Sequence, residues 1–332
     1  MGLCISKWSA DHHKYRVNDH DDCQEIVLFD DGDNPIDGIS SSSGSSLCSR
    51  EGSKGVNQDA AVIYKVYGGK EDVTFCGVFD GHGTNGHLVS KFVRNYLMNF
   101  LLDQKIIALK NKRSSKKACI SAFKVIDEKI RHFENMDCSL SGTTAVIVLR
   151  QGDNLMIANL GDSRAVLGVM NYDGEITAVQ LTTDLKPSVT TERKRIKRRN
   201  GRVLALLHEP HIERVWLPQQ NIPGLAMTRS FGDFLVKNHG IISIPEVSFH
   251  HLTSKDQFLI IATDGVWDVL NNDEVATIVA STDTKVTAAE ALVNAAVSKW
   301  GEKHPSSNRD DCTALILSLH TNLATKTNVS SS

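Results

Sequence analysis

The chain contains no apolar run of the ~18–20 residues that a membrane-spanning helix needs. Its N-terminus lacks the apolar core of a secretory signal, so we expect no export by that route. Neither sign of charge dominates, because 37 Lys and Arg stand against 39 Asp and Glu and leave a net charge of -2. We therefore expect no whole-protein attraction to nucleic acid or to acidic membranes.

Cysteines are few and show no paired spacing. Seven are scattered along the chain, and none belongs to a C-x-x-C pair. An odd number without paired spacing argues against a disulfide framework and against a structural zinc site. We therefore expect a protein of the reducing cytosol.

The composition is that of a soluble globular protein, with 41% hydrophobic and 23% charged residues in a chain of 332. Residues 1–49 differ from the rest, because they hold an acidic run at 30–35 and the serine tract Ser40–Ser46. Such a stretch buries too little apolar surface to offset its ordering entropy, so we expect a flexible arm. Residues 50–320 are then the folded domain, and 321–332 a second, shorter tail.

Short aliphatic or β-branched runs alternate with helical patterns between the two tails. The predicted strands are Thr74–Phe79, Thr143–Leu149, Leu155–Leu160, Ala165–Val169, Phe258–Ala262 and Thr313–Leu319. The predicted helices are Gly86–Leu102, Ala118–Phe133, Thr191–Asn200 and Ala288–Lys299. Because the strands come largely in pairs joined by short polar turns, antiparallel sheets are favoured over a doubly wound parallel sheet.

Aspartates gather where these strands begin or end. The five places are Asn57-Gln58-Asp59, Asp80-Gly81-His82, Gly161-Asp162, Asp264 to Asp268, and Asp310-Asp311. Each taken alone is typical of an ordinary turn. Several carboxylates at one sheet edge would repel unless cations neutralise them, and hard oxygen ligands without Cys favour Mg²⁺ or Mn²⁺ over zinc. Two such ions ~3.5–4 Å apart can clamp a phosphoryl group.

Six motifs, in this order, resemble those of the metal-dependent type 2C protein serine/threonine phosphatases. They are FDGHG (79–83), SGTTA (141–145), GDSRA (161–165), GLAMTRSFGD (224–233), ATDGVWDVL (262–270) and DDCTA (310–314). The resemblance covers about residues 50–320, and the spellings QDA, ERVWLP and PGLAMTRSFGDF are most like the plant members. It implies an α+β fold in which two antiparallel β-sheets pack face to face, with helices on both sides and a metal site at one edge.

The resemblance also implies a ligand set for two Mg²⁺ or Mn²⁺ ions. Asp80 would bridge both ions, and the carbonyl of Gly81 would bind one of them. Asp264 and Asp310 would be the other direct ligands, while Asp59 would act through metal-bound water. A glycine suits position 81 because the backbone itself must approach the ion.

The remaining roles follow from the same resemblance. Asp162 and Asp268 match acids linked to a third metal position. A hydroxide that bridges the two metals would attack phosphorus, and His82 would protonate the departing Ser or Thr oxygen as general acid. The chain departs from many family members at Gln58, where they carry Glu, and at Lys54, where they carry a phosphate-binding Arg. Lys supplies the charge without the bidentate fork of Arg.

The implied activity is hydrolysis of phosphoserine and phosphothreonine in proteins, by an enzyme expected to be a monomer. The alternative is a pseudo-phosphatase that binds phosphoproteins or kinases without turnover, although the retained Asp80, His82, Asp264 and Asp310 argue against it. A cysteine-dependent phosphatase is excluded, because no Cys is followed by five residues and an Arg. A metal-dependent phosphatase of small molecules stays open. Nucleic acid is not an expected partner.

The first six residues, MGLCIS, fit the pattern for N-myristoylation at Gly2, with Cys4 placed for palmitoylation. We therefore expect a cytoplasm-facing enzyme at the plasma membrane. Two basic stretches, 110–117 and Arg193–Arg199, have three possible roles. They could be solvated surface, they could attract phosphorylated substrates, or they could be nuclear localisation signals. The last role gives the alternative location, cytosol and nucleus.

Overall fold

The computed structural model describes residues 26–29, 44–65, 67–70, 72–104, 106, 111–134, 136–207, 209–282, 287–305 and 308–319. The expected acylation sites Gly2 and Cys4 lie outside these residues, as does the expected tail 321–332. Most of the expected N-terminal arm also lies outside them.

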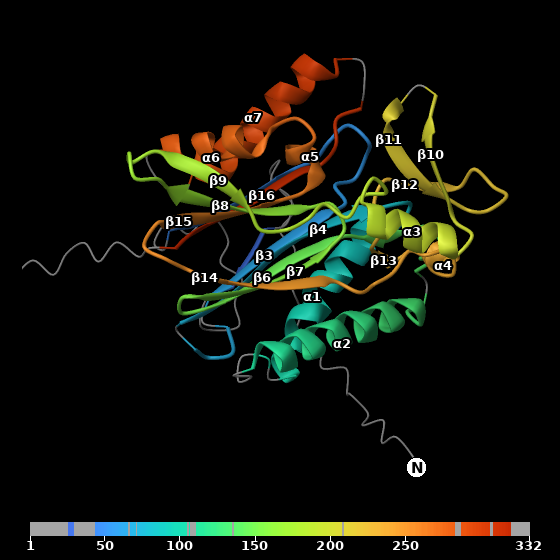
Figure 1. The fold of residues 1–332 in the computed structure, drawn as a ribbon, viewed down its shortest axis with the longest axis horizontal. Coiled ribbons are helices and arrows are strands. Elements are labelled where there is room, and N and C mark those ends of the chain that lie inside the picture. Colours follow the sequence, from blue (N-terminus) through green and yellow to red (C-terminus); the bar gives the residue numbers. More distant parts are fainter. Residues whose placement is uncertain are drawn as a thin grey trace, which may run out of the picture.

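Two β-sheets packed face to face form the centre of the molecule (Figure 1). The first contains, in spatial order, β1 (Ile26–Phe29), β3 (Asp59–Lys65), β4 (Val73–His82), β6 (Ala145–Gln151), β7 (Asn154–Leu160) and β14 (Glu246–His251). The short strand β5 (Gly142–Thr143) pairs with β4, and β13 (Phe231–Gly232) pairs with β5. The second contains β2 (Ser45–Arg50), β16 (Cys312–Ser318), β15 (Asp256–Ala262), β8 (Arg164–Met170) and β9 (Ile176–Gln180). Among the described strands, only β1 pairs in parallel, with β3.

The central strands are apolar throughout because both of their faces are covered. In β15, Leu259 and Ile261 point into the core between the two sheets. Phe258 and Ile260 alternate with them and pack under the helices on the other side. This period-two alternation is what a pleated strand imposes on a continuous apolar run.

Helices cover the outer face of each sheet (Figure 1). The first sheet carries α1 (Gly86–Asp103) and α2 (Lys112–Arg131), and the second carries α5 (Asp264–Trp267), α6 (Asn272–Ser281) and α7 (Ala288–Lys303). The expected sandwich of two sheets between helical layers is thereby confirmed. Helix α2 begins earlier than expected, because the Asn111 side chain accepts a hydrogen bond from the Arg113 backbone and caps it. Within the described residues, every helix is too short or too polar to span a bilayer.

A smaller lobe stands at one end of the sandwich (Figure 1). It contains a third sheet of β10 (Arg202–Leu206), β11 (Glu209–Trp216) and β12 (Pro223–Leu225), with α3 (Thr190–Arg198) and α4 (Phe234–Lys237) beside it. The sequence predicted only α3 of this lobe. In the basic stretch of α3, Arg193 pairs with Glu213 and Arg195 with Glu192, whereas Lys194 is exposed.

The expected boundary of the arm at residue 49 is wrong for Ser45–Ser49, which belong to β2. This strand pairs along its whole length with β16. Its serines have partners that composition alone cannot reveal: Ser46 accepts a hydrogen bond from the Ala289 backbone, and Ser49 bonds to Thr313. Ile26–Phe29 of the expected arm also forms a strand, β1.

Candidate active site

The ends of β3 and β4 place two of the predicted acids side by side. Asp59 and Asp80 are direct partners in the register of this antiparallel pair. The chain then passes through Gly81, where an added Cβ would lie 2.5 Å from the carbonyl oxygens of Gln58 and Gly86. Glycine is therefore needed here for close backbone packing, whatever its carbonyl binds.

The second sheet contributes acids from the same edge, where β15 ends and β16 begins. Asp264 opens the short helix α5 directly after β15, and Asp310 precedes β16. The two sheets are tied together here, because the Thr263 hydroxyl donates to Asp59 at 2.9 Å. Asp311 accepts hydrogen bonds from the backbone of Gly52 and of Gln58, which joins the loop before β3 to the start of β16.

The electrostatics of these acids show how closely they gather. Burial raises the pKa of Asp80 well above its ordinary range, and the carboxylates of Asp264 and Asp59 raise it further. Burial likewise raises the pKa of Asp264, with Asp268 and Asp310 adding to the shift. Burial and the Asp311 carboxylate raise the pKa of Asp59 to about 8. Mutual repulsion of this kind needs positive charge to offset it.

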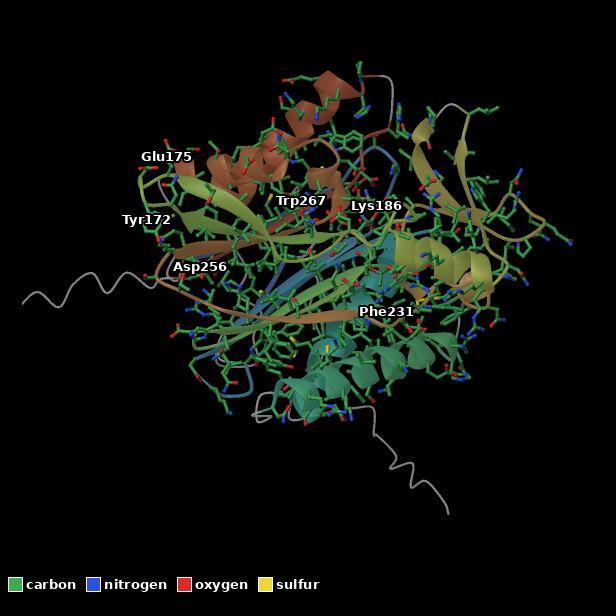
Figure 2. All side chains as sticks on the ribbon, in the orientation of Figure 1. Tyr172, Glu175, Lys186, Phe231, Asp256 and Trp267 are labelled. Carbon is green, nitrogen blue, oxygen red and sulfur yellow. The ribbon has the colours of Figure 1, made fainter. Side chains whose placement is uncertain are left out.

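A lysine that the sequence reasoning missed lies among the acids. The Nζ of Lys186 is 3.4 Å from Asp268 and 3.7 Å from Asp162. Burial alone would lower its pKa, but these two carboxylates raise it, so the lysine stays charged. Figure 2 shows Lys186 at the end of the sandwich that faces the β10–β12 lobe.

Lys54 lies at the exposed rim of the cluster. Its Nζ is 2.5 Å from an oxygen of Asp310, and half of its side chain is exposed. Burial would lower its pKa, but the Asp310 carboxylate raises it. The expected cation is therefore beside the acids and accessible to a phosphoryl group.

His82 is held by a second residue that the sequence reasoning did not assign, Asp233. The His82 Nε2 lies 2.7 Å from Asp233 Oδ2, which also accepts a 2.5 Å hydrogen bond from Ser230. Asp233 is fully buried and has the left-handed φ of 52°. Gly142 leaves room for the pair, because a Cβ there would lie 2.5 Å from Asp233 Oδ2.

This pairing leaves one ring nitrogen of His82 without a hydrogen-bond partner among the residues that the structure describes. Nε2 is committed to Asp233, whereas Nδ1 is buried and has no hydrogen-bond partner in the described residues. Burial would lower the pKa of His82, but the Asp233 carboxylate raises it. The motif SFGD contained Asp233, but one sequence does not show which histidine it meets.

Two arginines of the motifs are structural. Arg164 of GDSRA makes two hydrogen bonds to Asp184, and Arg229 of TRSFGD makes two to Glu192. The pKa of Glu192 is about 2, because the hydrogen bonds from Arg229 and Arg195 outweigh the cost of burial. These pairs anchor α3 and the loop after β9 rather than entering the site.

The acids fit a divalent metal by donor chemistry. All are hard carboxylates, which suit Mg²⁺ or Mn²⁺, and no cysteine is among them. Both carboxylate oxygens of Asp162 are buried without a hydrogen-bond partner in the described residues. This is expected of a carboxylate that binds a cation or a metal-bound water. Over the same residues, no three acidic, histidine or cysteine side chains already surround one point as ligands do.

The order of the motifs along this site agrees with a known family. The family model described as Protein phosphatase 2C matches residues 43–303. The chain belongs to the protein phosphatase 2C family. The phosphatase is 47% identical over 331 residues to Probable protein phosphatase 2C 72 of Arabidopsis thaliana, an alignment that covers 96% of this chain and 98% of the relative.

Two further comparisons agree. The phosphatase is 46% identical over 328 residues to Probable protein phosphatase 2C 61 of Arabidopsis thaliana, which covers 96% of this chain and 97% of that one. The crystal structure of serine-threonine phosphatase 2C from Toxoplasma gondii superposes with a TM-score of 0.74 at 22% identity, over 82% of this chain and 94% of the other. The resemblance to plant type 2C phosphatases, the enzyme class and the fold are confirmed.

Proposed function

We propose that this phosphatase hydrolyses phosphoserine and phosphothreonine in proteins and requires Mg²⁺ or Mn²⁺. The observation that carries the proposal is the meeting of Asp59, Asp80, Asp264 and Asp310 at one edge of the two sheets, where burial and the neighbouring carboxylates raise the pKa of the first three. Such an accumulation of buried and half-buried carboxylates is costly in a structural role and is typical of a cation site.

Asp80, the Gly81 carbonyl, Asp264 and Asp310 would hold two ions, with Asp59 acting through water. Asp162 and Asp268 would serve a third, weaker position. When bound, Mg²⁺ or Mn²⁺ supplies Lewis acidity that neutralises phosphoryl charge and makes water a better nucleophile at neutral pH.

Residues of the chain supply the rest of the chemistry. Lys54 at the rim attracts the phosphoryl oxygens. His82, whose Nε2 bonds to Asp233, donates a proton to the departing Ser or Thr oxygen as general acid. Asp233 holds the ring in that orientation and favours its protonated form, so it acts as a positioning residue.

Side-by-side assays on phosphoserine, phosphothreonine and phosphotyrosine peptides of one sequence test the substrate class. We expect release of phosphate from the first two in the presence of Mn²⁺ and far slower release from the third. A preference for phosphotyrosine, or for small phosphate esters over all three peptides, would overturn the assignment.

We also propose that the enzyme is held at the plasma membrane by myristate on Gly2 and palmitate on Cys4. One myristoyl chain gives marginal binding, with an association constant of about 10⁴ M⁻¹, so stable attachment needs a second signal. Cell fractionation should find Gly2→Ala wholly soluble and Cys4→Ser weakly bound. Membrane attachment of Gly2→Ala would contradict this proposal, and a wholly soluble wild type would favour the cytosol and nucleus.

A further inference from the structure

The outer surface of α2 carries a strong excess of positive charge. Five basic side chains, none with a carboxylate partner among the described residues, are exposed there: Lys112, Arg113, Lys116, Lys117 and Lys124. We call these five the basic row. No acidic residue occurs from 112 to 126, although the whole chain has a net charge of -2. The acids that follow are engaged, because Asp127 pairs with Lys237, and Glu128 with Arg131 and His132.

The adjoining helix adds exposed apolar side chains. Leu88, Phe92 and Tyr96 follow one another at four-residue spacing on α1, and Phe133 follows α2. Phe92 stacks on Tyr96 at 4.3 Å between ring centroids and meets the Phe133 ring at 5.0 Å. Leu88, Tyr96 and Phe133 are 43%, 43% and 47% exposed. We call these three residues, together with Phe92, the aromatic patch, and it faces solvent.

The basic row and the aromatic patch belong to the same helical layer, which covers the first sheet (Figure 1). Lys129 of α2 lies over the Tyr96 ring of α1, with its Nζ 5.9 Å from the ring centroid, so the two helices are in contact there. Phe133 contacts Phe92 near the start of α1, so the helices run antiparallel. The basic row therefore lies at the end of the layer away from His82, whereas the aromatic patch lies on the half of α1 that begins beside His82.

We propose that this face of α1 and α2 binds the surface of an anionic phospholipid membrane. Clustered lysines are attracted to anionic headgroups, and aromatic side chains with a polar neighbour settle at the headgroup level. Both helices lie flat in one layer, which suits a plane better than the groove of a duplex nucleic acid. The face supplies a second membrane signal that does not depend on acylation of Cys4.

Vesicle sedimentation of the full-length, unacylated chain tests this proposal. Vesicles of phosphatidylcholine mixed with phosphatidylserine should bind the protein, and vesicles of phosphatidylcholine alone should not. Added salt should weaken the binding, because exposed charges are screened. The triple variant Lys116→Glu/Lys117→Glu/Lys124→Glu should bind at least about tenfold more weakly, since each reversal replaces attraction by repulsion.

The matched control carries the same charge change on α3, at the exposed Lys194, Lys197 and Arg198. We expect this variant, with all three residues changed to Glu, to retain binding to phosphatidylserine vesicles. Phe133→Ser should weaken the binding severalfold and leave its salt dependence intact. The α2 and Phe133 variants should release phosphate from an aryl phosphate at the wild-type rate, which shows that they fold and separates this test from that of the catalytic proposal.

Three results would overturn the membrane assignment. The first is absence of binding to phosphatidylserine vesicles. The second is an equal loss in the α2 and α3 variants, which would show that only net charge matters. The third is binding to a single-stranded RNA oligonucleotide without binding to vesicles, which would make the face a nucleic-acid surface.

Discussion

Asp233 determines, at the scale of single residues, how His82 can act. Asp233 is buried, fixed by Ser230 and bonded to Nε2 of His82. A histidine so placed has one free ring nitrogen and a raised pKa, because the neighbouring carboxylate favours its charged form. Both features suit an acid that protonates a poor leaving group.

His82→Ala should therefore slow hydrolysis of a phosphothreonine peptide by ~10²–10⁴-fold. It should slow hydrolysis of an aryl phosphate far less, because an aryl oxygen departs without protonation. Asp233→Asn removes the carboxylate charge but keeps the shape, so it should give a smaller loss with the same selectivity. The measurement is kcat for both substrates, and equal losses on the two would mean that His82 is structural.

The double variant is the sharper comparison. If Asp233 acts through His82, adding Asp233→Asn to His82→Ala should have little further effect on the phosphothreonine peptide. Multiplied losses would show that Asp233 has a separate role.

Helix α2 supports, at the scale of elements, the turn that carries Asp233. Asp127 of α2 accepts a hydrogen bond from the Gly232 backbone at 2.9 Å and pairs with Lys237 at 3.2 Å. Lys237 in turn donates to the Ser230 carbonyl at 2.6 Å. The buried carboxylate of Asp127 therefore holds the turn between β13 and α4 in place.

Asp127→Ala should lower the free energy of unfolding by roughly 3–5 kcal/mol, because it leaves the largely buried Lys237 ammonium without its carboxylate partner. Glu128→Ala is the matched control on the next residue. Its surface pair with Arg131 is exposed, so the loss should stay below about 1 kcal/mol. Urea denaturation measures both, and similar losses would contradict the assigned role of Asp127.

The sequence predicted the elements whose periodicity comes from burial. In α1, Val89, Val93, Leu97 and Leu101 repeat every four residues and all are buried. The strands of the β10–β12 lobe were not predicted, because many of their side chains are exposed and buried and exposed positions do not alternate along them. The Asp residues were found because they lie at the beginnings or ends of apolar strands. Lys186 and Asp233 were not, since their partners lie 82 and 151 positions away.

The carboxylate cluster should control, at the scale of the whole molecule, how stability depends on pH without metal. The pKa of Asp59 is about 8 in the folded chain, against about 3.9 for an unperturbed Asp. Between these values the folded state holds a proton that the unfolded state has released. Stability is therefore present at low pH and is lost as pH rises through this window.

Chelator-treated protein should thus show a free energy of unfolding that falls from pH ~5 to pH ~8. Asp59→Asn should reduce this slope, because the amide does not ionise. Mn²⁺ should raise stability most at the high end, where the carboxylates are charged. Denaturation at several pH values, with and without Mn²⁺, measures these differences. A wild-type slope identical to that of Asp59→Asn would contradict the proposed protonation of Asp59.

Metal-dependent release of phosphate from a phosphothreonine peptide tests the central claim most directly. We expect hydrolysis with Mg²⁺ or Mn²⁺, none after chelation, and recovery when metal is restored. Asp264→Asn should remain inactive in excess Mn²⁺ while keeping its fold, because it lacks an anionic ligand. Hydrolysis that survives chelation, or binding of the peptide by metal-loaded wild type without turnover, would contradict the account.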